Sequence, residues 1–135
     1  MRRSFYTCPV LRDRERERRS SPKPVDDKIE PGDHALVCVA CGHIITNDDF
    51  RIEMNGAHEH TFVNPGGFQH HIGCFNAAPG CAYTGNTESA FSWFPGWTWQ
   101  VAVCARCRAH VGWIYRNAGE QFHGLIVAAL RRIQI

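Results

Sequence analysis

Two short cysteine pairs constrain this chain more than any other feature. Cys38 and Cys41 form one C-x-x-C, and Cys104 and Cys107 form another, with 62 residues between the pairs. Each pair lets two thiolates converge on one ion from a tight turn, and two pairs supply the tetrahedral four-sulfur shell that zinc prefers. We therefore predict one structural zinc ion that ties the start of a domain to its end. Four protein ligands leave no position for a reactive water, so the ion holds the fold and performs no chemistry.

A redox function is the rival reading of a C-x-x-C. Each pair, however, ends a β-like segment, and two pairs suit a metal clamp better. The remaining thiols, Cys8, Cys74 and Cys81, are interpreted as a tail thiol and two core or loop thiols; a catalytic thiol is the less favoured alternative. Cysteines in metal-type spacing fit a reducing compartment, so the sequence predicts a cytoplasmic protein.

The leading segment, residues 1–32, is predicted to be a flexible basic tail. Residues 1–28 hold nine Arg and Lys against five Asp and Glu and few apolar residues, which is too little apolar surface to offset the entropy of ordering. The start resembles a twin-arginine export signal, but its apolar stretch runs into charged residues without a cleavage site. Residues 29–135 hold six basic against eight acidic residues, and no apolar run is long enough to span a membrane. We expect neither nucleic acid nor membrane as a partner.

Residues 33–135 are predicted to form one mainly β domain. Short apolar stretches such as HALVCVAC, HTFVN, FQHHIGCF, WTWQVAVC and HVGWIY are separated by Gly, Pro, Asn and Asp, a texture typical of compact β domains. The late stretch FHGLIVAALRRI, residues 122–133, fits either a short helix or a closing strand, and its periodicity does not decide between them.

Three of the four tryptophans, Trp93, Trp97 and Trp99, lie beside one Pro-Gly pair in SWFPGWTW at residues 92–99. The fourth, Trp113, lies in HVGWIY just after the second cysteine pair. Because Pro-Gly suits the centre of a tight turn, we expect Trp93 and Trp99 on strand ends that face each other. Val111, Trp113 and Tyr115 alternate and so are expected to share one face of a strand. The sequence predicts that Trp93, Trp99 and Trp113 form an aromatic box; ordinary core packing is the alternative.

An aromatic box has two obvious guests. One is an alkylammonium group held by cation–π attraction, and the other is a small flat neutral ring that packs on the indoles. A cationic guest normally requires an acidic residue at the rim. Between Glu88 and Glu120 the sequence has no Asp or Glu, so the neutral ring is favoured.

Taken in order, these elements resemble the CULT (cereblon-like thalidomide-binding) domain family, and in particular its stand-alone bacterial members. The resemblance covers residues 36–133 and is carried by CVAC with the following glycine, NGAHEHTFVNP, CF, FSWFPGWTW, CARCRAHVGWIY and FHGLI. It implies a β-tent, in which two antiparallel sheets meet at an angle and are pinned by zinc at Cys38, Cys41, Cys104 and Cys107.

The resemblance also implies a ligand site. The cage is Trp93, Trp99 and Trp113 with Tyr115 behind it. Further contacts implied by position are Asn64, Pro65, His70, Ser92 and the backbone of Phe91. Trp97 stands where a tyrosine is more usual, and His70 where members carry Phe or His.

The function implied is binding without catalysis. Expected ligands are cyclic imides of the glutarimide or thalidomide type, uracil-type rings, and cyclic imides at the termini of damaged proteins. The segments that dock a ubiquitin-ligase adaptor precede this domain in the family's longer members, and we expect none here. The rival functions are a methionine-R-sulfoxide-reductase-like enzyme using Cys74 beside His70 and His71, and a reader of methylated ammonium groups. A second metal site among His58, His60, His70 and His71 is the less favoured reading of those histidines.

Overall fold

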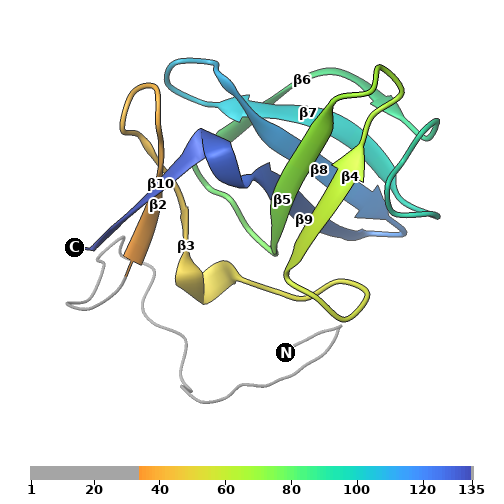
Figure 1. The fold of residues 1–135 in the computed structure, drawn as a ribbon, viewed down its shortest axis with the longest axis horizontal. Coiled ribbons are helices and arrows are strands. Elements are labelled where there is room, and N and C mark those ends of the chain that lie inside the picture. Colours follow the sequence, from red (N-terminus) through yellow and green to blue (C-terminus); the bar gives the residue numbers. More distant parts are fainter. Residues whose placement is uncertain (1–33, 135) are drawn as a thin grey trace. The chain divides into compact units, whose positions relative to one another are not determined.

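The computed structural model describes residues 34–134. Within that range the protein is mainly β, and its only helical turns are two short 3-10 segments, η1 (Asp48–Phe50) and η2 (Val127–Ala129) (Figure 1). No helix among these residues is long and apolar enough to cross a membrane. The tail predicted for residues 1–32 lies outside the described residues.

A small antiparallel sheet joins the start and the end of the domain. Its strand order is β10-β2-β3, built from β2 (His34–Cys38), β3 (Ile44–Asn47) and β10 (Leu130–Gln134). Leu130 pairs with Cys38, and Gln134 pairs with His34. The last strand therefore lies beside the first described one, with the first cysteine pair at the end of β2 (Figure 1).

A larger antiparallel sheet forms the rest of the domain, in the order β4-β5-β9-β8-β7-β6. Its strands are β4 (Glu59–Val63), β5 (Gln69–Phe75), β6 (Cys81–Glu88), β7 (Thr98–Cys104), β8 (His110–Asn117) and β9 (Glu120–Ile126). Two antiparallel sheets and a four-cysteine cluster confirm the predicted fold class.

The ambiguous stretch at residues 122–133 is strand, then η2, then strand. The four residues from Phe122 to Leu125 are all buried, because β9 lies between β5 and β8 and is covered on both faces. A strand buried on both faces is a continuous apolar run, which explains why periodicity could not identify it. The turn at η2 then carries the chain from the large sheet to the small one.

The large sheet has an apolar layer on each face. One layer includes Ile45, Phe75, Val111 and Leu125 together with two of the zinc-type cysteines, and it fills the space between the sheets. The other includes Ile72, Phe94, Tyr115 and Phe122, with the half-buried tryptophans packed against it. Each large side chain that is fully buried contributes about 1.5–3 kcal/mol, so both layers stabilise the fold substantially.

The connection from β5 to β6 couples the sheets through Gly80. The Gly80 N–H donates to the Ile45 carbonyl at 3.0 Å, and the Gly80 carbonyl accepts from the Ala105 N–H at 2.9 Å. A Cβ at this position would overlap the carbonyl oxygen of Ile44. Glycine is therefore required where this loop passes between β3 and the second cysteine turn.

Candidate functional site

The two cysteine pairs fold into matching turns. In the first, the Cys38 N–H donates to the His43 carbonyl and the Gly42 N–H donates to the Cys38 carbonyl, both at 2.8 Å. In the second, Cys104 and Arg108 make the equivalent bonds at 2.8 and 2.9 Å. Gly42 and Arg108 occupy the same left-handed position, with φ values of 83° and 70°. Glycine adopts this conformation freely, whereas arginine does so at a steric cost.

The four cysteine Sγ atoms lie within 4.8 Å of one another. Two pairs of sulfurs from opposite turns lie 3.6 Å apart, Cys38 with Cys107 and Cys41 with Cys104. A tetrahedral zinc ion with Zn–S bonds of about 2.3 Å places its sulfurs roughly 3.8 Å apart. The spacing and the all-sulfur donor set therefore fit zinc. When bound, the ion supplies a cross-link between β2 and the β7–β8 connection.

The surroundings of Cys104 favour its thiolate. Burial alone would raise the pKa of this thiol, but the backbone N–H groups of Cys107 and Arg106 and the neighbouring thiols outweigh burial and lower the pKa to about 7. The Arg106 N–H lies 3.4 Å from the sulfur. A ligand that deprotonates easily binds a metal cation more readily at neutral pH.

The other described cysteines have the opposite character. Burial raises the pKa of Cys74 to about 12, and burial with the nearby Cys104 raises that of Cys81 to about 12. Both therefore remain neutral thiols near pH 7. Neither has the lowered pKa that a nucleophilic cysteine requires.

Three of the four histidines considered for a second metal site make hydrogen bonds to carbonyl or carboxylate oxygens. His58 Nδ1 donates to the Ile52 carbonyl at 3.0 Å, and His60 Nε2 lies 2.9 Å from the Met54 carbonyl. His71 Nε2 donates to the Glu59 carboxylate at 2.6 Å. Among residues 34–134 the four cysteines are the one group of three or more potential ligands close enough to share an ion.

The aromatic residues gather on one face of the large sheet. Trp99 pairs with Tyr115 between β7 and β8, and Tyr115 pairs with Phe122 between β8 and β9. Paired residues of antiparallel strands project to the same side. Trp99, Tyr115 and Trp113 therefore share a face, and the neighbouring strand β5 contributes His70 to the same layer.

The loop before β7 covers this face. The Trp97 N–H donates to the Phe94 carbonyl at 3.0 Å and Gly96 has φ 91°, so the Pro-Gly turn is present as predicted. The expected strand position of Trp93 is wrong, however, because β6 ends at Glu88 and β7 begins at Thr98. On the β6 side the strand partner of Trp99 is Glu88, and Trp93 reaches the sheet from a long loop.

Buried Phe94 anchors that loop. Its ring lies 5.0 Å from the rings of Tyr115 and of Phe122, and Ser92 Oγ caps the turn by accepting from the Phe94 N–H at 3.2 Å. The indole N–H of Trp99 donates to the Ala90 carbonyl at 2.7 Å. These contacts hold Trp93 over the sheet.

Three rings converge at the centre of the site. Trp93 and Trp113 meet nearly perpendicularly, with centroids 4.9 Å apart. The His70 ring lies 5.2 Å from that of Trp113 and 5.8 Å from that of Trp93. Trp99 lies on the same face beside Tyr115, but no direct ring contact joins it to the other two tryptophans within the described residues.

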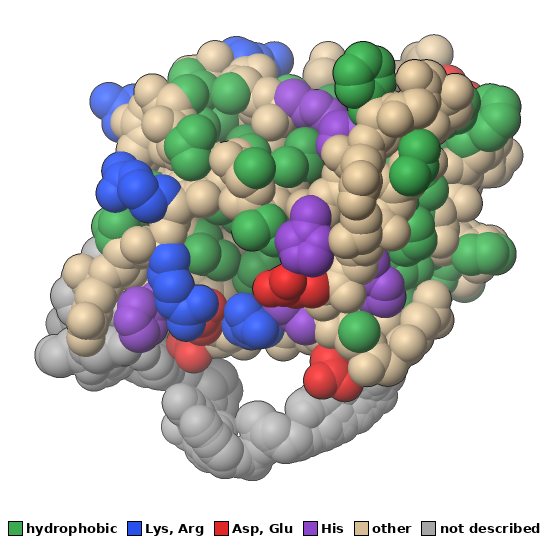
Figure 2. Space-filling model, viewed as in Figure 1, with side chains coloured by type: hydrophobic (Ala, Val, Ile, Leu, Met, Phe, Trp, Pro, Cys, Tyr) green, Lys and Arg blue, Asp and Glu red, His purple; other side chains and the backbone are tan. Residues whose placement is uncertain are grey.

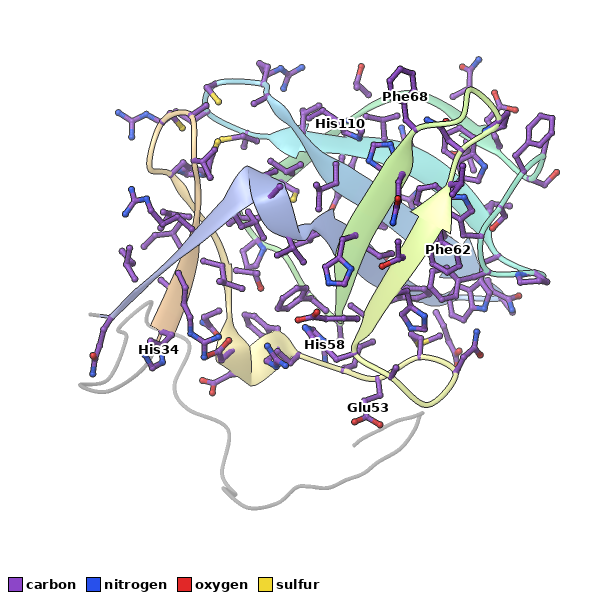
Figure 3. All side chains as sticks on the ribbon, in the orientation of Figure 1. His34, Glu53, His58, Phe62, Phe68 and His110 are labelled. Carbon is purple, nitrogen blue, oxygen red and sulfur yellow. The ribbon has the colours of Figure 1, made fainter. Side chains whose placement is uncertain are left out.

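Two further rings were missed by sequence reasoning, and Figure 3 labels both. Phe62 of β4 stacks on Trp93 at 4.9 Å, and His110 meets Trp113 edge-on at 4.8 Å. Alternation along HTFVN could have identified Phe62. His110 could not be found this way, because a register shift at Ala102 in β7 interrupts the pairing of β7 with β8.

The remaining predicted site residues lie in loops around the rings. Asn64 and Pro65 follow β4, and Asn64 Oδ1 accepts from the Phe68 N–H at 2.9 Å. Phe91 has φ 60° and is 74% exposed. Trp97 packs on Phe122 with centroids 4.9 Å apart, so its ring belongs to the core layer.

Comparison with known proteins identifies similar chains, although no family model matches. The chain is 32% identical over 92 residues to "Protein cereblon" of Drosophila pseudoobscura pseudoobscura, covering 63% of this chain and 15% of that protein. It is 33% identical over 89 residues to "Protein cereblon" of Danio rerio, covering 62% and 20%. For Drosophila melanogaster the values are 31% over 74 residues, 53% and 12%. The matches therefore span a fifth or less of these relatives.

Proposed function

The chain contains a cereblon-like (CULT) domain, and we propose that its aromatic site binds a small neutral ring with an imide edge, such as a glutarimide or uracil ring. The observation that supports this most directly is the perpendicular contact of Trp93 and Trp113, at 4.9 Å, on the sheet face that also carries Trp99. Perpendicular and adjacent indole faces offer apolar walls to a flat guest.

An imide edge consists of an N–H flanked by two carbonyl groups, so its binding requires one acceptor and two donors. The indole N–H of Trp93 makes no hydrogen bond within the described residues, in contrast to that of Trp99, and it is the donor we assign to one carbonyl. We assign the remaining groups to the backbone of Phe91, a residue that is 74% exposed, and of the half-buried Ser92. A guest that leaves such a group buried and unpaired loses about 1–3 kcal/mol, which gives the site its specificity.

In this proposal zinc is structural. The ion is held by Cys38, Cys41, Cys104 and Cys107. Cys104 begins the turn from β7 to β8. Strand β7 carries Trp99, and strand β8 carries Trp113. Fixing this turn fixes the two strands that carry the aromatic walls. The metal therefore orders the site without contacting the ligand.

Catalysis is not part of the proposal. The reductase reading needs an exposed nucleophilic thiol, and Cys74 is buried with a pKa raised to about 12 by desolvation. Turnover of a methionine-R-sulfoxide peptide that disappears in Cys74→Ser would overturn this assignment.

A protein can present the same imide edge as a small molecule. A chain terminus closed into a cyclic imide carries the same N–H and carbonyl groups as a free glutarimide, so it is the macromolecular ligand that we propose. Competition between such a peptide and free glutarimide for one site tests this extension.

One observation supports a methylated ammonium group as a second candidate ligand. Glu88 pairs with Trp99 between β6 and β7, which brings a carboxylate to the strand position opposite an indole. A cation–π guest gains from a nearby carboxylate. Titration with trimethyllysine peptide, with Glu88→Gln as the matched variant, separates this candidate from the imide.

Calorimetric titration with glutarimide and with N-methylglutarimide tests the main proposal. Methylation removes the imide N–H and leaves the ring and carbonyls, so we expect at least about tenfold weaker binding of the methylated ring. Trp113→Ala should abolish glutarimide binding, whereas Trp97→Phe, which changes a core ring outside the contact, should preserve it. Equal binding of the two rings would contradict recognition of the imide edge.

A further inference from the structure

A cavity lies on the face of the large sheet opposite the aromatic residues. It is a groove of about 250 Å³ between the two sheets. Its apolar lining includes Leu36, Phe75, Leu125, Val127 and Leu130. Phe75 and Leu125 alternate along their strands with Cys74 and Gly124, which belong to the aromatic face, so the groove and the aromatic site lie on opposite sides of the sheet.

Charged side chains border this apolar floor. Arg51, Arg132, His58 and Glu59 complete the polar part of the lining. On the face drawn in Figure 2, exposed hydrophobic side chains lie between arginine or lysine side chains and acidic and histidine side chains. The floor remains accessible at Val127, which is 42% exposed. The groove thus combines apolar surface with a charged rim.

Arg51 is the more loosely paired of the two arginines at the rim. Arg132 is bound to the Asp48 carboxylate, and Glu59 accepts from His71 at 2.6 Å. The closest carboxylate oxygen to Arg51 is Asp48 Oδ1 at 4.0 Å, which is too long for a hydrogen bond. The guanidinium donors of Arg51 therefore make no hydrogen bond among the described residues, and Asp48 itself does not line the groove.

His58 adds no charge to the rim. Its Nδ1–H donates to the Ile52 carbonyl at 3.0 Å. Burial is the main reason that its pKa is lowered, with Arg51 as a smaller contribution of the same sign. A Cβ at Gly73 would approach His58 Nε2 to 2.9 Å, so glycine at this position makes room for the neutral imidazole against β5.

We propose that this groove binds a small carboxylate with an apolar body, such as an arylalkanoate. Arg51 receives the carboxylate in a two-pronged contact, the geometry that guanidinium groups favour, and the apolar body packs on Phe75, Leu125 and Val127. An amine would be repelled by Arg51 and Arg132 at the rim, and a neutral molecule would offer the Arg51 guanidinium no charged acceptor. This site is independent of the imide site.

NMR titration of the zinc-loaded full-length chain tests the proposal, with 3-phenylpropionate as the probe and 3-phenylpropionamide as its uncharged isostere. We expect saturable shifts of the backbone amides of Gly73, Leu125 and Val127 with the carboxylate, and an affinity at least about tenfold weaker for the amide. The indole N–H signals of Trp93 and Trp113 should not move. Equal affinities, or shifts at the indoles, would overturn the proposal.

Matched variants sharpen the test. Arg51→Gln should weaken carboxylate binding about tenfold or more, whereas Arg131→Gln removes the same charge from a β10 residue outside the lining and should leave affinity unchanged. Val127→Asp places a negative charge beside the bound carboxylate at an exposed position of the groove. This variant should abolish carboxylate binding without changing a buried residue. If Arg51→Gln and Val127→Asp both bind 3-phenylpropionate as the native protein does, the groove is not a carboxylate site.

Discussion

The sharpest test of the zinc clamp is Cys107→Ser. Cys107 is the exposed member of the cluster, and serine is nearly isosteric with cysteine, so the substitution costs little packing and isolates the lost ligand. Structural zinc sites contribute about 10–16 kcal/mol, and one ligand of four accounts for roughly 3 kcal/mol of that. The stability of a whole domain is only about 5–15 kcal/mol. The variant should therefore lie close to the edge of folding.

Thermal unfolding followed by circular dichroism, with zinc content by mass spectrometry, measures this effect. A loss of roughly 3 kcal/mol lowers Tm by about 12–24 °C for a domain of this size. Cys81→Ala is the matched control, because Cys81 pairs with Cys104 but is not among the four clustered ligands; it should retain one zinc ion per chain. A Cys107→Ser protein with unchanged Tm and full zinc would refute the clamp.

Three further predictions follow from single residues. Arg108→Gly should raise the free energy of unfolding by about 0.5–1 kcal/mol in urea titrations, because relief of a left-handed cost of about 1–2 kcal/mol exceeds the added chain entropy of glycine; a loss of stability would contradict the parallel with Gly42. His123 is buried and neutral in the fold, with its pKa lowered by burial first and to about 4. Its contribution to stability is present above pH 6.5 and is lost as pH falls toward 4, so roughly 1.4 kcal/mol should disappear between pH 7.5 and 5.5, and His123→Gln should flatten that part of the urea-derived profile. Phe62→Ala should weaken glutarimide about two- to tenfold in calorimetry, because the loss of one stacked pair costs about 0.5–1.5 kcal/mol and frees Trp93; unchanged affinity would remove Phe62 from the site.

The cysteine spacing predicted the most reliable parts of the fold. Two C-x-x-C pairs that share one ion must meet although they are far apart in sequence, and their four sulfurs do lie within 4.8 Å of one another. Alternation along HVGWIY correctly placed Trp113 and Tyr115 on one face. It was wrong for Val111, which packs in the other apolar layer, because the β7–β8 register shifts between Ala102 and Val103. These features depend on spacing and period, which a sequence states directly.

Other features depend on tertiary contacts that no local pattern encodes. Trp93 was expected on a strand, but buried Phe94 anchors its loop to Tyr115 and Phe122, which are distant in sequence. Glu88 escaped notice as a neighbour of Trp99 because only the β6–β7 register brings them together. The groove likewise depends on how two sheets approach each other, and its lining is drawn from separate parts of the chain.

The most direct test of imide binding is a fluorescence titration of the zinc-loaded protein with thalidomide and, separately, with uracil. Saturable quenching of tryptophan emission is predicted, because the guest contacts the indoles of the aromatic site. Trp99→Ala, folded and zinc-bound, should lose it. A well-folded native protein whose emission does not respond to either compound at millimolar concentration would contradict the claim that this aromatic face is a binding site for imide rings.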